Sequence, residues 1–197
     1  MADLTFSQPA RRNLLVPVLL ALVILVAGIF ALLRYTPHTT ADAAVTHTAV
    51  YPSRVVFKTG SIVLNGDQVQ DDLYVLVTLR ITNHLHLPLF LKDFTGNLTT
   101  SSETGGGTLT ESAVEKPDLA NLLVTFPGLK KLTDAQTAKP LDRDTKIDPG
   151  QTAEGYITLH FPGPQTLWDH RQAASITIDL YHQQPLSVGI PNPAPQP

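Results

Sequence analysis

Two histidines near the middle of the chain, His84 and His86, have the residue type and spacing that a metal site would use. Alternate residues of a β-strand face the same side, so two imidazoles at this spacing would be neighbours on one face. A metal site needs three or four ligands, and only folding could bring His160 or His182 near the pair. We therefore expect His84 and His86 to be solvated histidines of a turn, with metal binding as the alternative.

A second group of candidate ligands is acidic and comprises Asp142, Asp144 and Asp148, with Asp134 upstream. Its spacing has some likeness to a calcium-binding loop, whose oxygen ligands come from closely spaced residues. However, the segment lacks the central glycine and the terminal glutamate of an EF-hand. We predict an acidic loop that stays solvated, and we retain calcium binding as an alternative.

Other chemical signatures are missing from the sequence. It contains no cysteine, which excludes disulfides, thiolate metal sites and cysteine nucleophiles. The glycines at 105–107 are not followed by a Lys-Ser or Lys-Thr pair, so we expect a solvated hairpin loop rather than a phosphate-binding loop. Ser187 does not lie in a Gly-x-Ser-x-Gly elbow. We predict that the protein is not an enzyme, has no catalytic residue and carries no cofactor.

The charge distribution also argues against a nucleic-acid partner. After Arg34 the chain has 11 basic and 16 acidic residues, a net charge of −5. Nucleic-acid binding depends on clustered lysines and arginines that neutralise phosphates. No such cluster accompanies these residues, so we predict no binding to nucleic acid.

Any site must be positioned by the elements of the fold, and the first of these is an apolar run from Leu14 to Leu33. At about 1.5 Å per residue, a helix of this length spans roughly 30 Å, the thickness of the hydrocarbon core of a bilayer. A helix also satisfies its own backbone groups in lipid. We predict a transmembrane helix over residues 14–34 that makes the protein an integral membrane protein.

Flanking charges predict the orientation of this helix. Arg11 and Arg12 precede it and Arg34 alone closes it, so the positive-inside rule favours a cytoplasmic tail over residues 1–13. The C-terminal part would then lie outside the cytoplasmic (inner) membrane on a single-pass anchor. A cleaved signal peptide is the alternative, because residues 41–43 have a small-x-small pattern, but the apolar run is longer than an ordinary signal peptide uses.

Composition divides the remainder of the chain. Residues 35–48 are rich in threonine and alanine without periodicity, which indicates a linker. Residues 49–190 are long enough to bury a single core. Residues 191–197 are rich in proline and are expected to form a disordered tail.

Alternation of apolar and polar residues predicts strands within this domain. It is cleanest over residues 72–83, which predicts a half-buried strand. The apolar face of that strand comprises Leu73, Val75, Val77, Leu79 and Ile81. Asn65-Gly66 predicts a hairpin turn between residues 62–64 and Val69. Further strands are predicted over residues 54–58, 87–91, 153–161, 175–181 and 185–190.

Two short helices are predicted between the strands. Apolar residues spaced i, i+3, i+4 and i+7 predict an amphipathic helix over residues 117–126, with Pro127-Gly128 as its stop. We expect this helix to pack on the sheets. A second helix of one or two turns is predicted over residues 165–172, after Gly163-Pro164.

Short alternating strands joined by Gly, Pro and Asn turns predict a mainly β fold, an antiparallel β-sandwich with one or two short helices. The strand over residues 72–83, the turn over residues 148–155 and the strand over residues 156–161 resemble immunoglobulin-like, telokin-like domains of unknown function on bacterial envelope proteins. The resemblance covers residues 50–190 and implies a binding module. It implies no catalytic residues.

We therefore expect a membrane-anchored module that binds another envelope protein. Exposed sheet edges and the helix from Leu119 to Phe126 are the expected contact surfaces. The alternative is an envelope sensor for a small ligand or metal, with either His84 and His86 or the acidic loop over residues 142–148 as its site.

Overall fold

The computed structural model divides the chain into two compact units, residues 1–38 and residues 39–197. Helix α1 (Leu15–Tyr35) belongs to the first unit, and all the described strands belong to the second. The predicted tail over residues 1–13 and most of the tail predicted over residues 191–197 lie outside the described residues. The structure describes residues 15–35, 39–57, 68–101 and 106–192.

Helix α1 corresponds to the predicted membrane span. Its mean hydropathy over Leu15–Leu32 is 3.0, and the side chains of this span are exposed. Pro17 lies in the first turn, where a missing N–H costs little. Among the described residues, α1 is the one helix long and apolar enough to cross a membrane. It is consistent with a single-pass anchor.

The first strand, β1 (Ala41–Phe57), corrects the predicted linker and domain boundary. The linker predicted over residues 35–48 ends earlier, because Ala41 already pairs with Asn83 of β2 (Gln68–Asn83). Ala41 is buried, and Ala43 and Val45 pack against the same core. Alanine favours strands only weakly, so residues 41–48 gave little local signal, and pairing with β2 decides their conformation.

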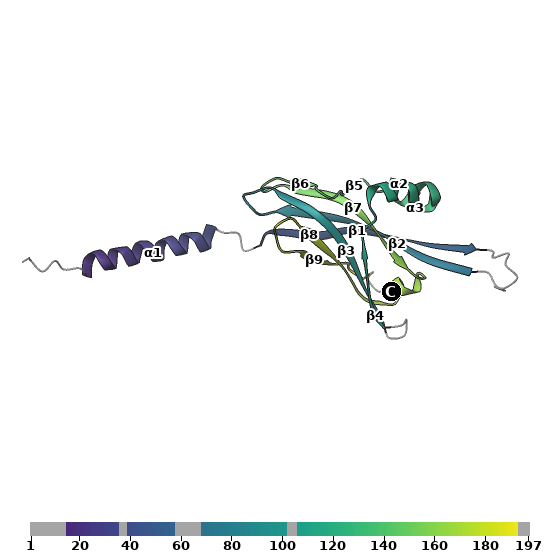
Figure 1. The fold of residues 1–197 in the computed structure, drawn as a ribbon, viewed down its shortest axis with the longest axis horizontal. Helices are drawn as coiled ribbons and strands as arrows, with labels where there is room; N and C mark the ends of the chain where they lie inside the picture. The colour runs from purple at the N-terminus through teal and green to yellow at the C-terminus, as the bar shows by residue number, and fades with distance from the viewer. Residues whose placement is uncertain (1–14, 36–38, 58–67, 102–105, 193–197) are drawn as a thin grey trace, which may run out of the picture. The chain divides into compact units, whose positions relative to one another are not determined.

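The described strands form two sheets (Figure 1). One sheet has the order β1-β2-β7-β5, and the other has the order β4-β3-β8-β9, with β6 paired to β3. The pairing is antiparallel except between β5 and β7. The remaining strands are β3 (Leu89–Thr100), β4 (Gly107–Ser112), β5 (Lys139–Pro140), β6 (Lys146–Ile147), β7 (Thr152–Pro162), β8 (Arg171–Leu180) and β9 (Leu186–Gly189).

Strands β1 and β2 run on past the other strands as a two-stranded ribbon (Figure 1). Residues 54–57 pair with residues 68–71, whereas β7 pairs with β2 only from Asp72 onward. The predicted Asn65-Gly66 turn and the strand segment at residues 62–64 lie outside the described residues.

The inner faces of the two sheets share one apolar core. The alternating face predicted for residues 72–83 is confirmed, since Leu73, Val75, Val77, Leu79 and Ile81 are each 0% exposed. Burying such a side chain contributes about 1.5–3 kcal/mol before entropic costs. The other fully buried large side chains of this core are Leu89, Leu91, Leu98, Leu159, Phe161, Ile176 and Ile178.

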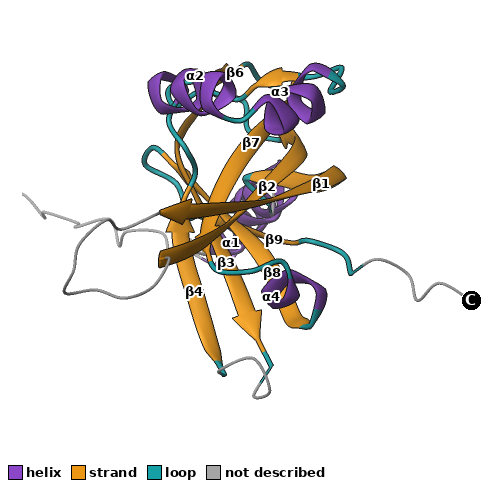
Figure 2. Ribbon diagram, turned by 90° about the vertical axis from the view of Figure 1, so that its right-hand side faces the viewer, coloured by secondary structure: helices purple, strands orange, loops and turns teal. Residues whose placement is uncertain are grey.

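The outer face of β2 is buried as well at Tyr74, Leu76 and Thr78, although Arg80 on the same face is exposed, so the prediction of a half-buried strand was wrong for this stretch. Tyr74 and Leu76 pack with Leu129, which lies on α3 (Pro127–Asp134). Figure 2 shows α3 beside α2 (Lys116–Thr125), the predicted amphipathic helix, next to β7. Helix α2 ends at Thr125, directly before the predicted stop at Pro127-Gly128. Pro127 then lies in the first turn of the next helix, α3, where a proline is favourable.

Asn83 closes the turn that follows β2. Its side-chain amide donates hydrogen bonds to the carbonyl oxygens of Leu87 and Ile147, each at 2.9 Å. Its side-chain oxygen accepts a hydrogen bond from the backbone N–H of Leu85 at 2.9 Å. The side chain is fully buried, so these bonds satisfy polar groups that water does not reach.

Candidate functional site

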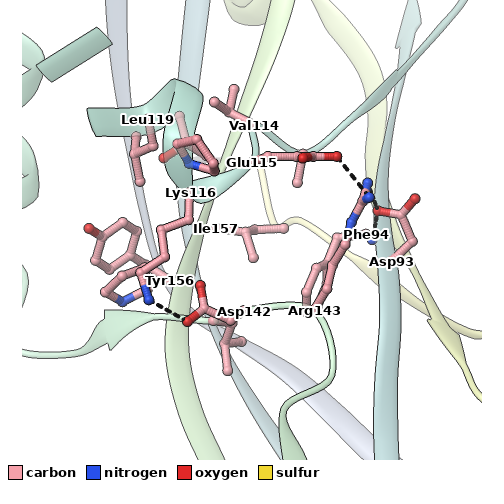
Figure 3. Close-up of a pocket in the computed structure, with 15 residues that line it drawn as sticks. Asp93, Phe94, Val114, Glu115, Lys116, Leu119, Asp142, Arg143, Tyr156 and Ile157 are labelled. Carbon is pink, nitrogen blue, oxygen red and sulfur yellow. Dashed lines mark hydrogen bonds and ion pairs between the residues drawn. The ribbon is translucent and has the colours of Figure 1, made fainter. Parts of the chain in front are cut away.

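A cavity of about 220 Å³ lies beside β7 (Figure 3). Residues 113–117 and Leu119, which lead into α2 and form its first turn, make one wall, and residues 140–143 make the opposite wall. Phe94, Leu119, Tyr156 and Ile157 line the interior, and each is nearly buried. This lining is apolar and aromatic, as in many small-molecule sites.

Gly155 determines how closely one wall approaches β7. β5 pairs in parallel with β7, with Lys139 opposite Gly155. A Cβ atom at residue 155 would lie 2.6 Å from the carbonyl oxygen of Lys139 and 2.6 Å from Leu141 Cγ. Only a residue without a side chain allows this approach, which brings residues 140–143 to the cavity.

Ion pairs join the two walls at the rim (Figure 3). Lys116 Nζ lies 2.8 Å from Asp142 Oδ2. Arg143 contacts Glu115 Oε1 at 2.8 Å and Asp93 Oδ1 at 3.0 Å. Partly exposed pairs of this kind contribute only about 0–1 kcal/mol each. They can therefore separate at small cost when a molecule enters.

Two polar groups lie along β7 within the cavity lining. The Thr158 hydroxyl oxygen is buried and has no hydrogen-bond partner among the described residues. Burial raises the pKa of the Tyr156 phenol above its ordinary value, and the charge of Asp134 raises it further. The arrangement suits a small, largely apolar molecule with one hydrogen-bonding group.

The raised pKa of Tyr156 predicts a loss of stability in alkali. Unfolding restores the ordinary pKa of 10.0, so the unfolded chain loses this proton at a lower pH than the folded chain. The free energy of unfolding should therefore fall as pH rises from the unfolded pKa through the folded pKa. In Tyr156→Phe this contribution is absent, and the decline from about pH 9 to about pH 11 should be shallower.

Urea unfolding of the full-length protein in detergent micelles at a series of pH values measures this effect. Around neutral pH, below the unfolded pKa, the two proteins should have the same pH dependence. An equal or steeper alkaline decline in Tyr156→Phe would contradict the assignment to Tyr156.

The histidines considered as metal ligands lie outside the lining of this cavity. His84 and His86 are exposed in the turn after β2, and His84 Nε2 lies 2.7 Å from Asp42 Oδ2. His160 lies opposite Tyr74 of β2, about 30 Å along the strand from His84, and its Nε2 lies 2.9 Å from Asp72 Oδ1. The described residues contain no group of three or more His, Cys, Asp or Glu that could hold a metal ion.

The residues of the predicted solvated acidic loop, for which calcium binding was the alternative, do not converge on one point. Asp142 pairs with Lys116, Asp134 pairs with Lys130 and Asp148 pairs with Lys146. The Tyr181 hydroxyl donates a hydrogen bond to Asp144. This bond is the main cause that raises the pKa of the Tyr181 phenol, and the negative charge of Asp144 raises it further. Each of these acidic residues therefore has a partner of its own among the described residues. His182, the other possible third ligand, follows Tyr181 in a turn.

Sequence reasoning missed the cavity itself. Its rim joins residues distant in sequence, such as Arg143 and Asp93, and no local pattern predicts such a contact. The available signal was Gly155, because a glycine inside a predicted strand often marks a close approach of another segment.

Comparisons with known proteins found no matching family model, no similar curated protein and no similar solved structure. The immunoglobulin-like, telokin-like assignment therefore stays a prediction from sequence motifs. Two of those motifs meet in the structure: Asn83 N donates to the carbonyl of Gln151, and Gly150 N donates to the carbonyl of Asn83, both at 3.0 Å. The class defined by the geometry is a mainly β, two-sheet domain that follows one apolar helix.

Proposed function

We propose that this chain is a single-pass protein of the cytoplasmic membrane whose immunoglobulin-like domain, outside the cytoplasm, binds another envelope protein. The observation that carries this proposal is α1, with its mean hydropathy of 3.0 and exposed side chains. An exposed apolar helix of this length is stable in a bilayer but not in water. The first strand of the domain begins soon afterwards, at Ala41.

Two surfaces support a role in protein binding. Strand β4 lies at one end of its sheet, and its outer backbone groups are available to a strand from a partner. Val124 on α2 is 85% exposed, whereas Leu119 is the buried residue of this helix. Exposed edges and apolar helix faces are common contact surfaces in protein complexes.

Site-specific photo-cross-linking in cells tests this function. A photoreactive residue in place of Val124 or Thr110, which lies on β4, should capture one envelope protein in stoichiometric amount. The matched control is Gln172, an exposed residue of β8, which β3 separates from β4. It should capture no such partner, because a specific interface covers only part of the surface.

Self cross-links alone, or no cross-links at all three positions, would contradict the proposed partner. Equal capture of the same protein from Gln172 would contradict the proposed surfaces. The mass of the isolated protein tests the anchor in the same experiment, since cleavage at residues 41–43 would remove α1.

Small-ligand binding is the second candidate function. The cavity of Figure 3 favours it, because Thr158 supplies a buried hydroxyl without a partner among the described residues, beside an apolar interior and below a rim of ion pairs. Failure of the cross-linking experiment would favour this function over binding of an envelope protein.

A further inference from the structure

A second cavity lies between β1, the start of β8 and residues 191–192, and has a volume of about 410 Å³. We call it the Arg171 cavity after its most unusual lining residue. It shares no lining residue with the cavity of Figure 3. Its walls combine apolar side chains with one buried cation.

Arg171 is only 8% exposed. Its Nη1 donates to the carbonyl of Trp168 at 2.7 Å, and its Nη2 donates to the carbonyl of Pro191 at 3.2 Å. The guanidinium carbon also lies 3.9 Å from the centroid of the Trp168 ring. These contacts hold the planar group in one orientation.

The positive charge of Arg171 lacks an anionic partner among the described residues. No carboxylate there lies within ion-pair distance, and Nε is buried without a hydrogen-bond partner. Burial lowers the pKa of this guanidinium, and the charge of Asp169 offsets the effect only in part. Arginine nevertheless stays protonated, so a charged donor lies buried and incompletely satisfied.

Thr48 supplies a second unsatisfied group in the same lining. Its hydroxyl oxygen is buried without a partner among the described residues. Thr48 comes directly after an irregularity of β1 between Val45 and His47, where the pairing register between β1 and β2 shifts. Such bulges redirect side chains and are common beside functional sites. Of the three described residues that have a buried side-chain atom without a hydrogen-bond partner, Thr48 and Arg171 line the Arg171 cavity.

We propose that the Arg171 cavity binds a small carboxylate that carries an apolar body. The carboxylate accepts hydrogen bonds from Arg171 Nε and from the Thr48 hydroxyl, which satisfies both orphan groups and neutralises the buried charge. The apolar body lies against Val45, Val50 and Trp168. A phosphate fits less well, because its greater charge calls for more donors than these two groups and for less apolar walls.

The chain's single tryptophan lies in this lining, so its fluorescence reports directly on occupancy. Full-length protein in detergent micelles is titrated with butyrate at constant ionic strength. We expect a saturable change in emission. Butyramide, a neutral molecule of nearly the same shape, should bind at least about tenfold more weakly, because it lacks the charge that pairs with Arg171.

Thr48→Val is the decisive variant. It should weaken butyrate binding by about tenfold through loss of one hydrogen bond to a charged group. Its melting temperature should be unchanged or higher, because the substitution removes a buried hydroxyl that has no partner. Thr99→Val, a strand threonine outside both cavities, is the matched control and should bind butyrate like the original chain.

Arg171→Lys tests the charged donor. It retains the charge but loses the planar Nε donor, and it should bind butyrate at least about tenfold more weakly. Equal affinity for butyrate and butyramide would overturn the proposal, as would full affinity in Thr48→Val. Saturation by inorganic phosphate at a lower concentration than butyrate would overturn the assignment to a carboxylate.

Discussion

Truncation of Leu159 to alanine is expected to lower the free energy of unfolding by about 2–5 kcal/mol. Leu159 is 0% exposed and lies on β7 opposite Val75 of β2. Its side chain reaches across the core to β3, where a Cβ atom at Gly96 would lie 2.6 Å from Leu159 Cδ1. Truncation therefore leaves a void between the two sheets. Urea unfolding of the full-length protein in detergent measures the loss.

Two controls make this result specific. Leu87→Ala removes the same atoms from a side chain that is 70% exposed, and it should change stability by no more than about 0.5 kcal/mol. Gly96→Ala should destabilise the original chain by about 1–3 kcal/mol through crowding against Leu159, but little in the Leu159→Ala background. Equal costs of Gly96→Ala in both backgrounds would show that Leu159 does not fill this space.

Asn83→Asp is expected to destabilise the protein by about 3–5 kcal/mol, although the two side chains have nearly the same shape. The amide of Asn83 donates to the carbonyls of Leu87 and Ile147. A carboxylate there has no hydrogen to donate, so its oxygen would face two carbonyl oxygens in a site without water. The hydrogen bond that residue 83 accepts from Leu85 N would survive, but it would not compensate for the loss of the two donated hydrogen bonds.

Thermal or urea unfolding of the original chain, Asn83→Asp and the control Asn121→Asp measures the loss of stability in each variant. Asn121 is exposed on α2, so the same chemical change should cost no more than about 0.5 kcal/mol there. A small effect at residue 83 would mean that the hydrogen bonds donated by the Asn83 side-chain amide contribute little to stability. Backbone hydrogen bonds would then hold the turn after β2.

Much of the fold follows from local patterns. The strands at residues 72–83, 153–161 and 175–181 correspond to β2, β7 and β8, and the helix predicted over residues 117–126 corresponds to α2. Each has a clear apolar period, and the period of a segment depends only on its own residues. The first half of β1 was missed because its alanines and threonines carry no such pattern, and β2 supplies its pairing partner.

The sites were less predictable. His84 and His86 were identified by type and spacing, but their exposed turn brings no third ligand among the described residues. Thr48 and Arg171 gave no signal, because each is an ordinary residue in its own segment. Only the approach of β1 to the start of β8 places both in one cavity.

The sequence by itself determined the apolar helix and the alternating strands, because hydropathy and side-chain period are properties of consecutive residues. Only the tertiary structure decided that α3 covers the second face of β2, as Leu129 on Tyr74 shows. It also decided that a buried guanidinium and a buried hydroxyl share a cavity. Burial and hydrogen-bond satisfaction depend on segments far apart in the chain, which no local pattern contains.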